Sequence, residues 1–146
     1  MTNGPTTGRP WHLWVVGVLS LLWNCGGAFD YTMTKVGNAD YLASFTPDQL
    51  AWFDSFPVWA NIGWALGVGG SVAGSILLLL RHRWAIGAFA LSLIGVAITT
   101  LYQFGVADMP ESLNTSAGIV FSAAIWIVAI GLLWYAMRMR ARGVLR

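Results

Sequence analysis

Polar side chains interrupt the apolar stretches of this 146-residue chain at a few positions. Those that could take part in binding are Asn24, Asp30, Tyr31, Asn61, Thr99 and Gln103. Because a polar group is costly to bury in an apolar segment, such residues are candidates for a binding site. Amides, hydroxyls and a carboxylate suit hydrogen bonding to a ligand, so we predict that they converge on a polar pocket. The alternative is that they bond to one another or reach water at the helix ends.

The two histidines and the single cysteine offer little further chemistry. Cys25 alone rules out an intramolecular disulfide and redox chemistry by a cysteine pair. His12 and His82 lack the neighbouring carboxylates or cysteines that would complete a metal site, so we expect no metal and no cofactor. The sequence also holds no phosphate-binding glycine loop and no nucleophile–base–acid constellation. These observations predict that the protein is not an enzyme.

Four long apolar stretches must position the polar residues, at about residues 11–33, 58–80, 84–104 and 116–137. Only 10% of the chain is charged and 57% is hydrophobic, whereas soluble domains carry about 25% charged residues. Each stretch reaches the roughly 20 residues that cross a bilayer as a helix, and none alternates as a membrane strand does. We therefore predict an all-α, polytopic membrane protein with one domain over residues 1–146 and four transmembrane helices in two antiparallel hairpins.

Charged residues are sorted between the links that join these stretches. Seven of the eight basic residues precede the first stretch, follow the second or follow the fourth: Arg9, Arg81, Arg83, Arg138, Arg140, Arg142 and Arg146. All six acidic residues lie in or beside the other two links: Asp30, Asp40, Asp48, Asp54, Asp108 and Glu111. Basic residues stay on the cytoplasmic side, so this pattern predicts a bacterial inner-membrane protein with both termini inside. We expect the arginine tail to contact anionic lipids, and we expect no nucleic-acid partner.

The polar residues of the predicted pocket lie toward the outer side of the membrane. Asn24 follows the start of the first stretch by thirteen residues, roughly 20 Å along a helix. Asp30 lies near the outer interface rather than the midplane, and no polar partner continues a path inward, which disfavours a channel or a proton-coupled transporter. The sequence therefore predicts a pocket that opens outward.

The first outer link contains a strong helix start. Thr46 can cap a helix, Pro47 suits its first position, and Gln49 stands where a capping-box partner belongs. Aromatic residues then gather on one face, with acidic residues opposite. We predict a short interfacial helix over about residues 47–56 that lies on the outer membrane surface. The alternative is a lid over a site between the helices.

Small residues crowd the second stretch. Gly63 and Gly67 share a helix face, as do Gly70 and Gly74. Glycines four residues apart let helix backbones approach closely in lipid. We predict that this helix is central and that the four glycines serve helix packing; the alternative is self-association through a free glycine face.

Two segments carry a resemblance to known proteins. They are residues 13–34, which contain Leu-Leu-Trp-Asn-Cys-Gly-Gly-Ala-Phe-Asp-Tyr, and residues 45–56, which contain Thr-Pro-Asp-Gln-Leu-Ala-Trp-Phe-Asp. They resemble small uncharacterised four-helix inner-membrane proteins of bacteria, some of which carry automatic sugar-transporter labels. The resemblance implies the membrane fold and no established mechanism.

Two classes of function remain open from the sequence. The first is a non-enzymatic accessory or scaffold protein that acts through helix–helix contacts, as a homo-oligomer or in a larger membrane complex. It predicts that substitution of Asp30 has no effect. The alternative is a transporter that binds a small solute, such as a sugar, or a lipid in the outward-facing pocket. It predicts that substitution of Asn24 or Asp30 abolishes binding and leaves the fold intact.

Overall fold

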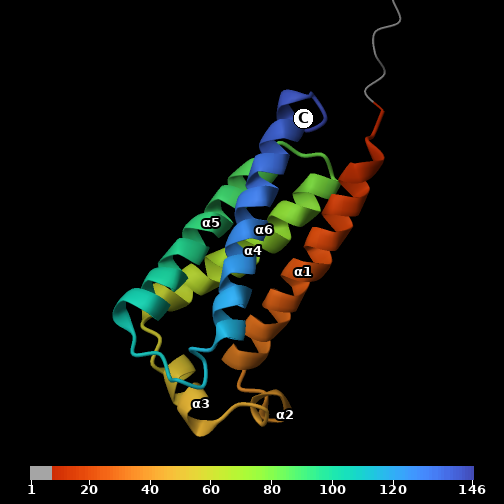
Figure 1. Cartoon of the computed structure of the whole chain (residues 1–146). Helices are drawn as coiled ribbons and strands as arrows, with labels where there is room; N and C mark the ends of the chain where they lie inside the picture. The colour runs from red at the N-terminus through yellow and green to blue at the C-terminus, as the bar shows by residue number, and fades with distance from the viewer. Residues whose placement is uncertain (1–7) are drawn as a thin grey trace, which may run out of the picture.

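The structure is a computed structural model that describes residues 8–146. Four long helices form a bundle, with two short helices at one of its ends (Figure 1). In chain order the elements are α1 (Trp11–Lys35), α2 (Ala39–Leu42), α3 (Pro47–Asp54), α4 (Val58–Leu79), α5 (Ala85–Leu101), the π-helical turn η1 (Tyr102–Val106) and α6 (Ser116–Ala141). Helices α1, α4, α5 with η1, and α6 are long and apolar enough to cross a membrane. The prediction of an all-helical chain with four such helices is confirmed, and it is consistent with a multi-pass membrane protein.

The helix ends differ from the predicted ones in a few places. Helix α1 runs two residues past the predicted end, to Lys35, and α6 runs four residues further, to Ala141. The predicted capping box is present at α3, where the Thr46 side chain accepts from the Gln49 backbone and Gln49 accepts from the Thr46 backbone. Helix α2 was not predicted; it is one turn long, and the Asn38 side chain caps it. So short a helix has no hydrophobic period to detect in the sequence.

The four long helices pack in the order α1, α4, α5, α6. Helix α4 lies against α1 on one side and most extensively against α5 on the other, while α6 packs on α5. Backbone contact between α6 and α1 is sparse. The bundle therefore has three packed helix pairs and one loose junction, which we call the α1–α6 seam.

Glycines bring α4 and α5 into backbone contact. A Cβ atom added to Gly95 on α5 would lie 2.5 Å from the carbonyl oxygen of Gly63, and one added to Gly70 would lie 2.8 Å from the carbonyl oxygen of Ala88. Gly67 and Gly74 also face α5, toward Val96 and Phe89 respectively. All four glycines that the sequence marks for helix packing thus lie on the α5 side of α4. Only glycine permits so close an approach of two helix backbones.

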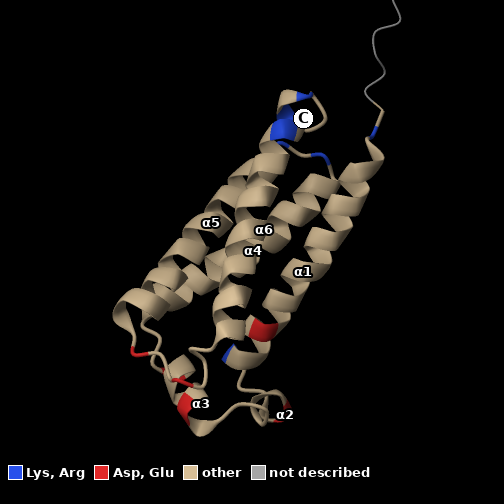
Figure 2. Cartoon of the chain, viewed as in Figure 1, with Lys and Arg blue, Asp and Glu red and all other residues tan. Residues whose placement is uncertain are grey.

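The two ends of the bundle carry opposite charge (Figure 2). The basic end holds the link between α4 and α5, with Arg81 and Arg83, and the C-terminal end of α6. The acidic end holds α2, α3 and the link between η1 and α6, and Lys35 is its single basic residue. Large apolar side chains are exposed along the sides of all four long helices, a surface suited to contact with lipid.

The C-terminal residues fold back over the basic end. Val144 and Leu145 are buried in the same apolar cluster as Leu13, Leu78 and Met139. The backbone of Arg146 exchanges two hydrogen bonds with the α4–α5 link, donating to the carbonyl of Arg81 and accepting from the N–H of Arg83, each at 2.9 Å. This closes the basic end with a packed layer.

Candidate functional site

A cavity of about 610 Å³ lies between the four long helices and extends to the acidic end. Its deep part is apolar, with Phe89, Val128 and Leu132 in the wall. Polar residues stand among aromatic and aliphatic ones in the rest of the wall: Asn24, Asp30, Tyr41, Ser71, Ser92, Thr99, Thr100, Gln103 and Ser122. The wall spans roughly 15 Å along α5 between Phe89 and Thr99, at 1.5 Å per residue. The site therefore has an apolar floor, and its part near the acidic end carries both polar and aromatic side chains.

Four of the six residues predicted to form a pocket line this cavity, namely Asn24, Asp30, Thr99 and Gln103. Tyr31 and Asn61 do not. Tyr31 follows Asp30 by one residue, which turns it about 100° around the helix, and its ring packs edge-to-face on Trp64 at 5.0 Å. The Asn61 amide donates to the carbonyl of Phe56 at 2.9 Å, so it closes the first turn of α4 instead of facing the cavity.

Hydrogen bonds within the protein hold several of the polar side chains in the wall. The Asn24 side chain donates to the Ser75 hydroxyl at 2.9 Å and to the Ser71 carbonyl at 3.2 Å. The Ser92 hydroxyl donates to the carbonyl of Gly67 at 2.7 Å, and the Thr99 hydroxyl to that of Gly95 at 2.9 Å. The donors of these three side chains are already used, so at these positions the wall offers a ligand mainly acceptor atoms.

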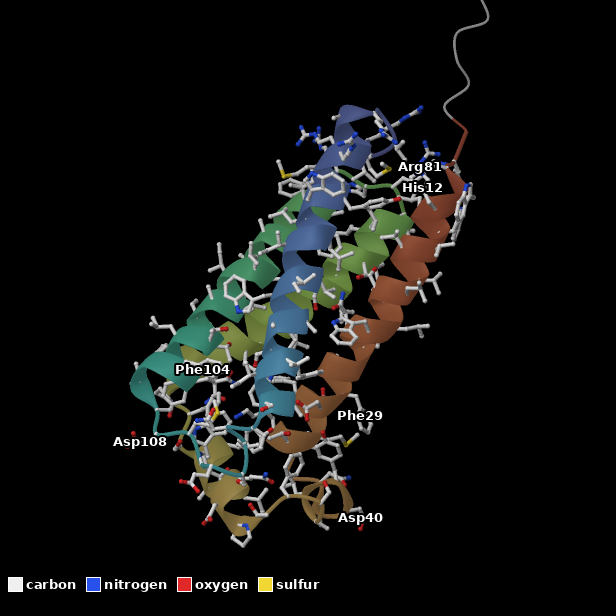
Figure 3. All side chains as sticks on the ribbon, in the orientation of Figure 1. His12, Phe29, Asp40, Arg81, Phe104 and Asp108 are labelled. Carbon is white, nitrogen blue, oxygen red and sulfur yellow. The ribbon has the colours of Figure 1, made fainter. Side chains whose placement is uncertain are left out.

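Asp30 is the only acidic side chain in the described cavity wall, which holds no Lys, Arg or His. The Tyr41 hydroxyl, from α2, donates a hydrogen bond to its carboxylate. Burial, with this hydrogen bond and the charge of Asp30 adding to it, raises the pKa of Tyr41 to about 12. The contact ties α2 to α1 beside the cavity. Figure 3 shows α2, marked by Asp40, beyond the acidic end of the long helices, with His12 and Arg81 at the basic end.

Helix α3 covers the acidic end through an aromatic cluster of Trp52, Phe53, Phe56, Trp64 and Tyr102. Trp52 and Phe56 are buried, and their rings meet edge-to-face at 4.9 Å. The Tyr102 hydroxyl donates to the carbonyl of Ser55 at 3.0 Å, which fixes the end of α3 to the end of α5. Phe53, Phe56 and Trp64 also line the cavity. The apolar face of α3 is thus turned toward the bundle and the cavity.

A cation lies on this aromatic cluster. The Lys35 ammonium is 5.2 Å from the centre of the Trp64 ring and 5.8 Å from that of Phe56. Both distances fall within the range of cation–π attraction, which extends to about 6 Å. The aromatic wall near Asp30 is therefore able to hold a positive charge.

The α1–α6 seam forms the side of the cavity where the helices are least joined. The rings of Trp23 and Phe121 meet across it at 5.9 Å, and both line the cavity. Toward the basic end, the His12 Nδ1 atom and the Tyr135 hydroxyl form a 2.5 Å hydrogen bond across the same seam. Gly27 lines the cavity, and a Cβ atom added there would meet no heavy atom within 4 Å. Side chains, not helix backbones, close this side.

The prediction from sequence omitted Tyr41, Ser71 and Ser92 from the site. Tyr41 lies on helix α2, which was not predicted, so nothing in the neighbouring sequence indicated its contact with Asp30. Ser71 and Ser92 stand among the small residues of α4 and α5, where a hydroxyl is expected to bond to its own helix. Ser92 instead bonds across the interface, because the glycines bring the two backbones together.

The described residues provide no group of three or more His, Cys, Asp or Glu side chains that could hold a metal ion. The arrangement is suited to binding by shape, apolar contact and one negative charge. Comparisons with protein-family models, with curated proteins and with solved structures find no match to this chain.

Proposed function

We propose that this protein is a non-enzymatic membrane protein that binds one small amphiphilic molecule in the cavity between its four long helices. The observation that carries the proposal is the lining of the cavity, which is apolar around Phe89 and Leu132 and mixes polar with aromatic side chains toward the acidic end. Its volume, about 610 Å³, falls within the roughly 300–1,000 Å³ of typical small-molecule sites. An amphiphile would place its tail against Phe89 and Leu132 and its polar group near Asp30 and Gln103.

The membrane arrangement belongs to the same proposal. Because arginines gather at the basic end, that end would face the cytoplasm of a bacterium and the acidic end would face outward. The four helices would cross the inner membrane as two antiparallel hairpins, with the arginines of the basic end near anionic lipids. Helix α3 would lie at the outer interface and act as a lid, since its aromatic face covers the cavity.

Two other roles have less support. An accessory or scaffold role rested on a free glycine face of α4, but Gly63, Gly67, Gly70 and Gly74 all contact α5. A sugar needs many hydrogen-bond donors and acceptors around its ring, whereas Asn24, Ser92 and Thr99 already donate to protein oxygens. An amphiphile, with one polar group and an apolar tail, fits this wall better than either a sugar or a partner helix.

The proposal is tested by filling the cavity. In Gly27→Trp the new ring enters the open space beside the cavity, and Gly27→Leu is a smaller version of the same change. Gly131→Trp is the matched control, because Gly131 is exposed on α6, has open space beside it and does not line the cavity. Circular dichroism and gel filtration check the fold of each variant.

Native mass spectrometry of the full chain in mild detergent, with added monoolein as a neutral amphiphile, measures occupancy. We expect wild type and Gly131→Trp to retain one amphiphile per chain, Gly27→Leu to retain less and Gly27→Trp to retain none. A wild-type protein that retains no amphiphile, or a Gly27→Trp protein that retains as much as wild type, would exclude the proposed function.

A further inference from the structure

We infer that the ligand of this cavity is a lipophilic cation, that is, an amphiphile with a positively charged headgroup; this inference rests on the proposed function. The first observation is the charge of the wall. Asp30 supplies a carboxylate, and the described residues that line the cavity include no Lys, Arg or His. A headgroup carrying phosphate or sulfate would lose its water here and find no opposite charge among these lining residues. A cationic headgroup would meet Asp30.

The aromatic cluster provides the second observation. Phe53, Phe56 and Trp64 present rings to the cavity close to the acidic end. The Lys35 ammonium already lies over two of these rings, which shows that their electron-rich faces accept a cation in this setting. A trialkylammonium or phosphonium group is larger and less strongly hydrated than a lysine ammonium, so it would lose less solvation energy on moving to the same surface. The bound headgroup would take the place of the Lys35 ammonium, or share the rings with it.

The net charge of the acidic end also favours a cationic ligand, and it acts over a longer range than Asp30 alone. The acidic end carries all six Asp and Glu side chains and one lysine, a side-chain net charge of −5. Such a field raises the local concentration of cations and lowers that of anions. It does so at the surface, before the ligand makes any contact with Asp30.

The α1–α6 seam gives the ligand a route from the membrane. Trp23 and Phe121 close the seam beside the cavity by one ring contact, and backbone contact between α1 and α6 is sparse. An amphiphile that partitions into the outer half of the bilayer could pass between these rings tail first. Its charged group would then follow along the acidic end to Asp30.

Binding of tritiated tetraphenylphosphonium to the full chain in lipid nanodiscs tests the inference. Tetraphenylborate, an anion of the same shape, is the matched ligand, and empty nanodiscs give the background. We expect wild type to bind one tetraphenylphosphonium per chain and to bind tetraphenylborate at least tenfold more weakly, as the loss of a close charge pair predicts. Asp30→Asn should weaken tetraphenylphosphonium roughly tenfold, and Lys35→Met should tighten it several-fold, because it removes both a competing cation and a positive charge.

Three controls separate charge from structure. Asn at position 30 keeps an oxygen that can accept from the Tyr41 hydroxyl, so the link to α2 is preserved while the charge is lost. Asp30→Glu restores the charge and should keep the preference for the cation. Asp48→Asn removes an exposed carboxylate outside the cavity and should change the affinity less than twofold.

The outcomes distinguish this inference from the proposed function. Equal binding of tetraphenylphosphonium and tetraphenylborate, or an unchanged affinity for the cation in Asp30→Asn, would overturn the inference. The proposed function would still stand if wild type retained monoolein. Weaker binding in Lys35→Met would also overturn it, because the competition at the aromatic rings would be absent. Failure of wild type to retain monoolein would instead remove the basis for both.

Discussion

The side-chain amide of Asn24 donates a hydrogen bond to the hydroxyl of Ser75, 2.9 Å away, and so joins α1 to α4 in the apolar middle of the bundle. Ser75 is fully buried, and its hydroxyl donates in turn to the carbonyl of Ser71 at 2.9 Å. The Ser20 hydroxyl donates to Ser75 as well, at 3.1 Å. The sequence predicted Asn24 as a ligand-binding residue, but its donors brace two helices.

Replacement of this amide should weaken the fold. We expect Asn24→Leu to lower the free energy of unfolding by about 1 kcal/mol, the scale measured for hydrogen bonds between membrane helices. Reversible unfolding in mixed micelles of detergent and dodecyl sulfate measures this quantity. Cys25→Leu is the control, because Cys25 is the exposed neighbour on α1 and should be neutral. Equal stability of Asn24→Leu and wild type would show that the bond contributes nothing.

The contact between α4 and α5 should tolerate no added methyl group. We expect Gly95→Ala to cost about 1–3 kcal/mol, because the new Cβ would meet the carbonyl of Gly63 and no side chain can move aside. Gly69→Ala provides the matched comparison, since position 69 has open space and alanine favours a helix by up to about 1 kcal/mol. Thermal unfolding followed by tryptophan fluorescence should give a lower Tm for the first variant and an equal or higher Tm for the second. The reverse order would contradict the close approach of these helices.

The helices of the fold were predictable because their sequence patterns are strong and extend over many residues. Continuous apolar stretches give the four long helices, and the Thr46–Gln49 capping box gives the start of α3. The junction of α5 with η1 was not predicted, because a π-helical turn depends on how Tyr102 packs beneath α3. The order of packing was only partly predictable: the short link at residues 81–83 makes α4 and α5 neighbours, but nothing local says that α1 packs on the other side of α4.

The contact between Tyr41 and Asp30 should be visible in an alkaline titration. The pKa of Tyr41 is raised from 10.0 to about 12, so the phenol stays protonated where an exposed tyrosine ionises. Stability from this contact is complete below pH 10 and declines as the pH rises toward 12, because a phenolate would face the carboxylate of Asp30. The ultraviolet absorbance of tyrosinate, taken as wild type minus Tyr41→Phe, measures the pKa.

The same titration of Asp30→Asn should lower the Tyr41 pKa part of the way toward 10, since the negative charge beside the phenol is gone while burial, the larger cause of the shift, remains. A difference spectrum that titrates at the ordinary tyrosine value in the wild-type protein would mean that α2 does not rest on Asp30 in solution.

Helix α3 should detach when its buried anchor is removed. Trp52 is 7% exposed and lies in one buried cluster with Phe56 and Tyr102. Trp52→Ala should therefore expose the cavity at the acidic end. We expect faster hydrogen exchange over residues 47–56 and faster release of a bound amphiphile, by roughly tenfold or more for the loss of a buried aromatic anchor. Val58→Ala, at a residue that is 76% exposed, is the control. Unchanged exchange in Trp52→Ala would show that α3 is held by other contacts.

The candidate site was predictable in part, and the limit has a physical cause. Asp30, Thr99 and Gln103 share the cavity because all lie toward the same end of their helices, which charge and spacing reveal, and Asn24 joins them from the middle of α1. Tyr31 and Asn61 lie at the same depth but point elsewhere, because rotation about the helix axis is set by packing. The position of a residue along its helix can be predicted from one sequence, whereas the direction of its side chain depends on how the neighbouring helices pack.

The weak attachment of α6 has a consequence for the role of the surrounding bilayer. Only 6% of the residues in its most apolar segment are buried, against 33% in that of α4. The apolar stretch of α6, residues 116–137, extends about 33 Å, slightly more than the roughly 30 Å hydrocarbon layer. A helix longer than the layer tilts, and the least restrained helix tilts first. Membrane thickness would therefore adjust the angle of α6 and the width of the seam beside it. Lipid composition would then tune how readily the site fills, without any change to the residues that line it.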